Sequence, residues 1–191
     1  MAPASRWKTT RWSPSHYGEV AAMILQETPK DILLLGAESD RDLLEVVRSY
    51  VPKGLQERIH NMAGQINLRE SMLVLKRSVL ALVNEGVDLQ LAQAAGTPSF
   101  VIYGSTSPSR GYGPRGSFDR IFTQDLPCIP CGSEGHLECP LDTLDCLEKT
   151  SAREVMDAIH AHLQTRQESQ VAQFDPCSDR QGAINDPEQG L

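Results

Sequence analysis

Five cysteines occur in the chain, and four of them lie in one short segment that could bind a metal ion. The four are Cys128, Cys131, Cys139 and Cys146. The first two form a Cys-x-x-Cys pair, and the other two follow in a loop that contains glycine and proline. Thiolates at such spacing can converge on zinc or iron in a tetrahedral arrangement. The irregular second half also fits reduced structural thiols or disulfides, because a regular zinc ribbon has two Cys-x-x-Cys pairs.

Two other potential ligands are left out of this expected metal site. We expect His136 to be a loop residue rather than a ligand, and Cys177, alone in the C-terminal tail, to be incidental. A redox role for the Cys128–Cys131 pair is disfavoured. A thioredoxin-type pair sits at a helix N-terminus, whereas this pair is set between prolines.

The turns at residues 84–86 and 104–106 are placed to bind phosphate. An apolar run at 79–83 ends at Asn84-Glu85-Gly86, a helix of small residues follows, and a second apolar run ends at Gly104. Strand, helix and strand joined by tight turns predict parallel strands. In such sheets the ligand lies beyond the carboxyl ends of the strands. Backbone N–H groups at a helix N-terminus suit phosphate.

A basic loop precedes the first expected helix. Residues 1–11 contain Arg6, Lys8 and Arg11 and no acid. Ser13 is placed to be the N-cap of that helix, with Pro14 at its first position. A basic loop that enters a helix can cradle phosphate, and the alternative is a charged segment that only meets solvent.

The elements that must position these residues alternate along the chain. Helical spacing or a capping box predicts helices that begin near residues 14, 40, 67, 87 and 151, and short apolar runs predict strands at 31–35, 58–63, 79–83, 100–103 and 118–122. The fold class is therefore α/β with a central parallel sheet flanked by helices. The segment 107–117 is a loop. Residues 167–191 are polar and are expected to form a disordered tail.

Length and charge exclude several kinds of protein. The chain has 191 residues and a net charge of −7, which argues against nucleic acid as a partner and against adsorption to anionic membranes. It can form one good core but not two full nucleotide-binding domains. No window reaches the roughly 18 apolar residues of a membrane helix, and no apolar signal core begins the chain. We expect a cytoplasmic protein.

The central segment resembles glycosyltransferase family 9, the heptosyltransferases of lipopolysaccharide core assembly. The family pattern here is Asp-Ser/Thr-Gly-x-x-His, then Leu-Ala-Ala-Ala, Gly-x-Pro, an apolar strand and Gly-x-Thr-x-Pro. Residues 96–98 and 104–108 match the last two glycine motifs. The places of the family's Asp, Ser/Thr, Gly and His are taken by Glu85, Gly86, Val87 and Gln90. The acidic residue is kept in kind and the His is lost.

The resemblance extends to the basic loop and to the cysteine segment. The family's Lys that contacts the nucleotide-sugar phosphates falls at Thr10, with Lys8 and Arg11 as the nearest cations. Glu38 is the nearest candidate for the acidic residue beside the adenosine ribose. Family members often carry a similar cysteine run, so zinc or iron is expected at the four cysteines, and none is needed for transfer. The implied donor-binding residues are Lys8, Thr10, Arg11, Glu38, Glu85, Gly86, Val87 and Gln90.

The resemblance covers roughly residues 4–161 and implies the C-terminal, donor-binding half of a GT-B glycosyltransferase. The expected organisation is a nucleotide-sugar-binding domain at 1–166, which includes a Cys-rich loop at 126–147, and the tail at 167–191. The implied activity is transfer of a sugar from ADP-heptose or a related donor to a lipopolysaccharide core acceptor. In the family an N-terminal domain carries the general base, so no catalytic residue is assigned. A separate acceptor-binding domain or subunit, and peripheral location at the inner membrane, follow as expectations.

A second interpretation is a catalytically inactive relative that binds a nucleotide or a metal, or that pairs with a partner. It is favoured by Thr10 in place of Lys and by Gln90 in place of His, since an amide forms hydrogen bonds but carries no proton at neutral pH. A dinucleotide-dependent oxidoreductase is a poor third, because no Gly-x-Gly-x-x-Gly follows a strand.

Overall fold

The structure is a computed structural model that describes residues 1–110 and 113–172. The chain divides into two compact units, Met1–Met156 and Asp157–Leu191. The first unit holds every strand of the described residues. Up to residue 172 the second unit consists of the C-terminal part of one helix, Ala152–Ala172.

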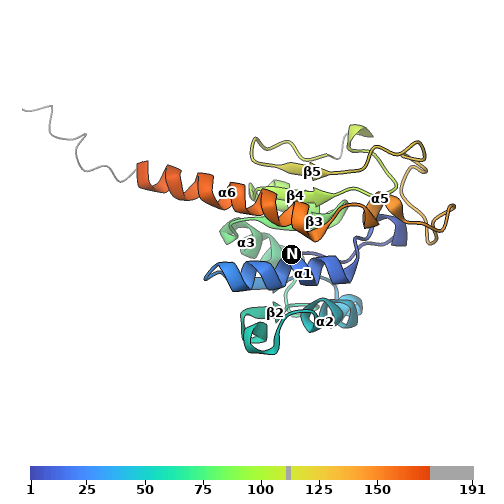
Figure 1. Cartoon of the computed structure of the whole chain (residues 1–191). Coiled ribbons are helices and arrows are strands. Elements are labelled where there is room, and N and C mark those ends of the chain that lie inside the picture. The colour runs from blue at the N-terminus through green and yellow to red at the C-terminus, as the bar shows by residue number, and fades with distance from the viewer. Residues whose placement is uncertain (111–112, 173–191) are drawn as a thin grey trace, which may run out of the picture. The chain divides into compact units, whose positions relative to one another are not determined.

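Two short parallel sheets form the centre of the first unit (Figure 1). In one sheet β1 (Ile32–Leu34) pairs with β2 (Ile59–Asn61). In the other the order is β3 (Ala81–Asn84), β4 (Ser99–Ile102) and β5 (Arg120–Phe122), with both pairings parallel. These five strands lie where the apolar runs predicted them, so the α/β fold with parallel strands is confirmed.

The first two residues join the two sheets. The Ala2 N–H donates to the Leu82 carbonyl at 2.9 Å and Ala2 forms a parallel bridge with Val83. On the other side the Leu35 N–H donates to the Met1 carbonyl at 2.9 Å. The segment therefore lies between β1 and β3. It fixes the start of the basic loop beside the carboxyl end of β3.

Most of the helices in the described residues begin where caps or helical spacing predicted them. Their bounds are α1 (Pro14–Glu27), α2 (Arg41–Ser49), α3 (Leu68–Arg77), α4 (Val87–Ala95), α5 (Asp145–Glu148) and α6 (Ala152–Ala172), and the 3-10 turns are η1 (Lys8–Thr10), η2 (Glu38–Asp40), η3 (Lys53–Arg58) and η4 (Pro108–Arg110). Helix α1 packs on α2, and α3 on α4. The short helix α5 was not predicted.

The caps show how local chemistry sets these bounds. The Asn67 side chain accepts from the N–H of Arg69 and Glu70, and the Glu70 carboxylate accepts from the Asn67 N–H, so the predicted capping box at α3 is confirmed. Gly96 ends α4 with a left-handed φ of 70°, as its place predicted. Ser13 occupies the N-cap of α1, but its side chain makes no capping bond.

The core explains why the sequences of β3 and β4 are continuous apolar runs. Both strands are buried along their whole length, as is typical of parallel strands in the interior of an α/β domain. The largest fully buried side chains include those of Phe100, Tyr103, Tyr17 in α1, and Trp12, which precedes that helix. The rigid sheet thus holds the ends of β3 and β4 in fixed positions.

The C-terminal boundary differs in detail from the expectation. Helix α6 continues to Ala172, past the expected start of the tail at residue 167. The remainder of that predicted disordered tail, residues 173–191 with Cys177, lies outside the described residues. Among the helices of residues 1–110 and 113–172, none has the length and apolarity to span a bilayer.

Candidate functional site

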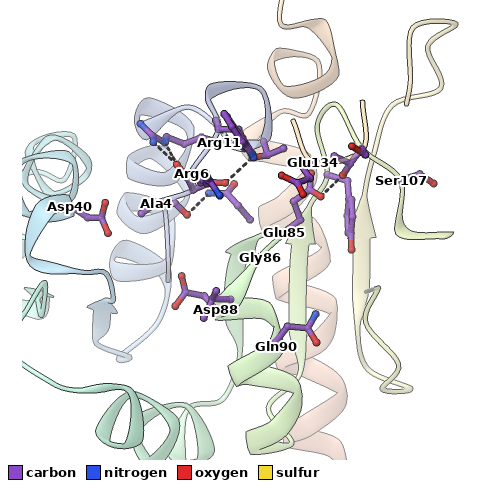
Figure 2. A pocket seen from close by; sticks show the side chains of 18 residues that line it. Ala4, Arg6, Arg11, Asp40, Glu85, Gly86, Asp88, Gln90, Ser107 and Glu134 are labelled. Carbon is purple, nitrogen blue, oxygen red and sulfur yellow. Dashed lines mark hydrogen bonds between the residues drawn. The ribbon is translucent and has the colours of Figure 1, made fainter. Parts of the chain in front are cut away.

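A cavity of about 780 Å³ lies at the carboxyl ends of β3 and β4 (Figure 2). Its lining residues come from the loop 4–11, from residues 84–90 at the end of β3 and the start of α4, from residues 103–107 after β4, from residues 133–134, and from Asp40. This is the place where a parallel sheet is expected to bind its ligand.

Two arginines of the basic loop line the cavity. The Arg6 guanidinium carbon lies 4.7 Å from the centre of the Trp7 ring, a cation–π contact. The Arg11 guanidinium donates to the Ser5 carbonyl, from Nε at 3.0 Å and also from Nη2. Within the described residues neither arginine forms an ion pair. Both positive charges are therefore available to an anionic ligand.

Asn84, the last residue of β3, anchors the basic loop. Its Nδ2 donates to the Pro3 carbonyl at 2.8 Å and to the Ala4 carbonyl at 3.3 Å, and its Oδ1 accepts from the Trp12 N–H at 3.0 Å. Asn84 is buried, so these bonds replace water that cannot reach it. One amide side chain thus holds both ends of the loop that carries the arginines.

Glu85 follows in the cavity wall, with one oxygen paired and one free. Its Oε2 accepts a hydrogen bond from the Thr106 hydroxyl. Its Oε1 is buried and has no hydrogen-bond partner within the part of the chain that the structure describes. Burial raises the pKa of the Glu85 carboxyl, against the lowering effects of the Thr106 hydroxyl and the Gly104 backbone N–H. Burial, together with the Glu85 charge, raises the pKa of Tyr103 to about 12.

Helix α4 directs its N-terminus at the cavity. Gly86 is the N-cap, with a φ of 139°, and no side chain caps this end of the helix. Val87 is 67% exposed at the first helical position, and Gln90 lines the cavity one turn later. The first N–H groups and the positive end of the helix dipole therefore face the same space as the two arginines.

Acidic side chains line other parts of the cavity. Asp40 and Asp88 contribute, as does Glu134 from the Cys-rich loop. The Asp40 carboxylate accepts from the Ala37 N–H at 2.9 Å. Burial raises the pKa of Asp88, with the Met1 amino group lowering it and Asp40 raising it. The cavity is thus charged with both signs rather than uniformly basic.

Six of the eight expected donor-binding residues line this cavity. They are Thr10, Arg11, Glu85, Gly86, Val87 and Gln90. Thr10 has little left to offer a ligand, because it is buried and its hydroxyl lies 2.7 Å from the Ser5 Oγ and donates to the Trp7 carbonyl. A donor-binding role for each of the six stays a prediction.

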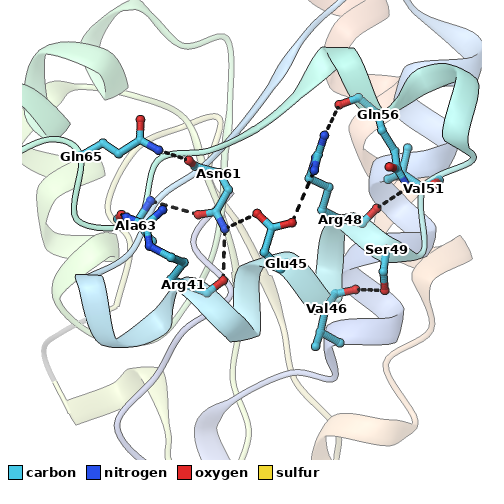
Figure 3. A network of polar contacts seen from close by, with 10 residues as sticks. All are labelled: Arg41, Glu45, Val46, Arg48, Ser49, Val51, Gln56, Asn61, Ala63 and Gln65. Atoms are coloured by element: carbon cyan, nitrogen blue, oxygen red, sulfur yellow. Dashed lines mark hydrogen bonds and ion pairs between the residues drawn. The ribbon is translucent and has the colours of Figure 1, made fainter.

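Lys8 and Glu38 are not among the lining residues. Glu38 forms an ion pair with Arg41 at 2.8 Å instead. Arg41 also donates to the Ala63 carbonyl, in the polar network that joins α2 to β2 (Figure 3). Asp40, two residues further on, occupies the cavity wall.

Sequence reasoning missed several lining residues. Arg6 lies beside Lys8 in the same basic loop, and nothing in the pattern distinguishes the two. Asn84 is predicted only as part of a turn. Its position as the polar end of an apolar strand is the signal that could have found it.

The four cysteines of the Cys-rich loop are free thiols in the described chain. Burial raises the pKa of Cys146 to about 11, with charges on Cys139, Cys131 and Cys128 adding to the effect. Within residues 1–110 and 113–172, however, no three His, Cys, Asp or Glu side chains meet in a metal-binding arrangement.

The Cys-rich loop is tied directly to the basic loop. The His136 N–H donates to the Thr9 Oγ1 at 2.7 Å, and the Thr9 Oγ1 lies 2.9 Å from the Ser105 Oγ. The Cys131 N–H donates to the Ser105 carbonyl at 2.9 Å, and the His136 Nε2 is 3.0 Å from the Cys131 carbonyl. Thr9 thus connects the cysteine segment, the end of β4 and the cavity loop.

A parallel sheet with a polar cavity at its carboxyl edge and a helix N-terminus in the wall defines a Rossmann-like α/β domain. The chain belongs to glycosyltransferase family 9 (heptosyltransferase), whose family model matches residues 1–141. A curated relative, lipooligosaccharide heptosyltransferase 2 of Haemophilus influenzae, is 30% identical over 98 residues, which cover 51% of this chain and 28% of that protein.

Solved structures share the fold. The ADP-heptose LPS heptosyltransferase II of E. coli superposes with a TM-score of 0.73 at 19% identity, covering 87% of this chain and 46% of that one. A family 9 glycosyltransferase of Veillonella parvula gives 0.68 at 17% identity, covering 85% and 44%. The iron-containing dodecameric glycosyltransferase TibC of enterotoxigenic E. coli gives 0.65 at 16%, covering 86% and 44%. The chain spans less than half the length of these relatives.

Proposed function

We propose that this chain is the donor-binding part of a heptosyltransferase-like glycosyltransferase. It would take ADP-heptose or a related nucleotide sugar, for transfer of the sugar to a lipopolysaccharide core acceptor. The observation that carries the proposal is the meeting of two arginines without ion-pair partners in the described chain and an uncapped helix N-terminus in one cavity. The names of the relatives supply the sugar and the acceptor class.

The cavity chemistry suits departure of a nucleoside diphosphate. As the bond between sugar and phosphate breaks, negative charge grows on the phosphate oxygens, and fixed cations and N–H dipoles stabilise that charge. Arg11 and the first turn of α4 supply both from rigid positions. The free Oε1 of Glu85 can accept a hydrogen bond from a donor hydroxyl. The general base would come from an acceptor-binding domain or subunit.

Titration calorimetry with ADP and ADP-heptose tests the proposal. Val87→Glu puts a carboxylate at the mouth of the cavity, and Val87→Gln is its uncharged match. We expect saturable binding that Val87→Glu weakens about tenfold and Val87→Gln leaves nearly unchanged, because only the first repels phosphate. Absence of binding by the folded wild-type chain would refute the donor site.

The alternative is an inactive nucleotide- or metal-binding partner protein. It is favoured by the Thr10 hydroxyl being engaged within the loop and by the amide of Gln90 in the cavity wall. Release of ADP from ADP-heptose separates the two functions. Release that depends on a lipopolysaccharide core acceptor and an acceptor-binding partner supports the enzyme. Binding without release supports the alternative.

We further propose that Cys128, Cys131, Cys139 and Cys146 hold a structural zinc or iron ion, which the transfer itself does not use. Four thiolates suit either metal, and all four lie within residues 128–146 of the Cys-rich loop. Elemental analysis of purified protein should give one metal per chain. Cys131→Ser should lower that content, while Cys177→Ser should not.

Cytoplasmic location, with peripheral contact at the inner membrane, completes the proposal. A lipid-linked acceptor would require the enzyme to work at that surface. Cell fractionation tests it, and recovery of the protein outside the inner membrane and cytoplasm would contradict it.

A further inference from the structure

Arg6 is a cavity cation to which the expected donor-binding residues assign no role. It lines the cavity, while Lys8, two residues away in the same loop, does not. Both side chains are exposed, so exposure does not distinguish them. Between the two residues the chain enters η1, a 3-10 turn over Lys8–Thr10 that begins directly after Trp7.

The state of the Arg6 guanidinium is unusual for a cavity arginine. Within the described residues it makes no hydrogen bond and no ion pair, and its contact is with the Trp7 ring at 4.7 Å. A ring face orients a guanidinium without using its N–H donors. Arg6 therefore presents five N–H donors, whereas Arg11 already donates from two nitrogens to the Ser5 carbonyl.

The surroundings of Arg6 indicate what it binds. The loop that carries it is held by the Asn84 side chain, directly before Glu85 and the N-terminus of α4. Four carboxylates also line the cavity, from Asp40, Glu85, Asp88 and Glu134, against the two arginines. A diphosphate with at least two negative charges is better balanced in such a cavity by a second cation beside Arg11 and the N-terminus of α4.

We infer that Arg6, held on the face of Trp7, is the main diphosphate-binding cation of this cavity, in place of the residues at 8 and 10. This inference rests on the proposed function and names the residue on which that site depends. A guanidinium fork matches two phosphate oxygens at once, which the ammonium of a lysine cannot do. Thr10 is buried and its hydroxyl is already hydrogen-bonded to Ser5 and Trp7, so it is not the phosphate-binding group of this loop.

The test is calorimetry with ADP at three salt concentrations on the full chain. Arg6→Gln should weaken ADP binding about 10- to 100-fold, the range for a lost charge-assisted hydrogen bond. It should also flatten the salt dependence, because one screened charge contact is gone. Arg6→Lys should restore the salt dependence and only part of the affinity. Lys8→Gln is the competing variant, and it should stay within about twofold of wild type.

Three outcomes would overturn the inference. Lys8→Gln could weaken binding while Arg6→Gln does not. Arg6→Gln could weaken binding with an unchanged salt dependence, which would assign Arg6 a role in loop packing. Failure of the wild-type chain to bind ADP is the third, and it alone refutes the proposed function as well. Thermal unfolding of each variant tests whether misfolding is the cause of weaker binding. The Arg6 and Lys8 side chains are exposed, so we expect the melting temperatures to stay near that of the wild type.

Discussion

At the scale of single residues, Glu85 is the cavity side chain with the most unfavourable surroundings. Its Oε1 is buried without a hydrogen-bond partner in the described chain, and burial raises its pKa above 4.5. A carboxylate in this state stabilises a bound hydroxyl but destabilises the empty site. A residue that destabilises the empty site indicates a position where ligand binding, rather than folding stability, determines the residue type.

Glu85 predicts a pH effect on stability with a definite sign. Above pH 4.5 the unfolded chain loses this proton before the folded one does, so ionisation of Glu85 lowers the free energy of unfolding as pH rises. Glu85→Gln removes that loss. We expect the melting temperature of the variant, relative to wild type, to rise from pH 4 toward pH 8. Glu57→Gln, at an exposed residue, is the control and should show no such trend.

A relative melting temperature that falls between pH 4 and pH 8 would contradict the assignment of a raised pKa. The same variant should weaken ADP-heptose binding more than ADP binding, if the free oxygen accepts from the sugar. Calorimetry with both ligands measures that difference directly.

At the scale of elements, the end of β3 determines where the basic loop lies. Asn84 is a buried side chain that bonds to both ends of this loop, through Pro3 and Trp12. Asn84→Ala leaves a buried carbonyl and a buried N–H without partners. We expect the free energy of unfolding to fall by about 1–3 kcal/mol in urea titrations. Gln65→Ala removes an exposed bond to the Asn61 carbonyl and should change it by less than about 0.5 kcal/mol.

An Asn84→Ala protein as stable as wild type would show that the loop is held by other contacts. Asn84→Ala should also weaken ADP binding, because a displaced loop would carry both arginines with it.

At the end of β4, position 104 has no room for a side chain larger than that of glycine. A methyl group at this position would overlap the Thr9 carbonyl oxygen and lie 2.9 Å from the Leu147 Cδ2. That carbonyl also accepts from the Ser105 N–H at 3.0 Å, so it cannot move without loss of a hydrogen bond. Gly104→Ala should destabilise the protein by roughly 3 kcal/mol. Gly54→Ala, with open space around it, should be neutral, and equal melting temperatures for the two would contradict the prediction.

The strands and helices could be predicted because their signals are local. Apolar runs predicted the buried strands β3 and β4, Asn67 and Glu70 predicted a helix start, and Gly96 predicted a helix end. The cavity side chains could be predicted only in part. Which of Arg6 and Lys8 faces the cavity depends on η1, a turn with no sequence signal of its own.

Glu38 was expected in the cavity, and it lies elsewhere for a different reason. Its side chain lies against Gly64, where any Cβ would overlap it, and pairs with Arg41. That placement depends on a contact between segments distant in sequence, which no local pattern encodes. Asp40, and not Glu38, lies in the cavity wall.

At the scale of the first unit as a whole, the Cys-rich loop and the cavity are parts of one hydrogen-bonded structure. Thr9 does not line the cavity, yet its hydroxyl accepts from the His136 N–H and pairs with Ser105. A metal ion at the four cysteines would therefore stiffen a loop that is bonded to the arginine-bearing segment. Thr9→Val replaces the hydroxyl with a methyl group of similar size.

A thermodynamic cycle tests this coupling. Removal of the proposed metal with a chelator under reducing conditions should weaken ADP binding to the wild-type protein several-fold, since the basic loop loses its support. Thr9→Val should weaken binding to a similar degree with the metal present. If the effect passes through Thr9, metal removal should add little in Thr9→Val, so the two losses will not sum.

Thr9→Ser supplies the control for that cycle, because it retains the hydroxyl that His136 and Ser105 use. It should respond to metal removal as the wild type does. Losses that sum fully in Thr9→Val would mean that the cysteine segment supports the cavity by another route, such as Ser133 and Glu134 in its wall. In that case the metal would act on the ligand's surroundings directly. Glu134→Gln would then be the variant in which metal removal has the smaller effect.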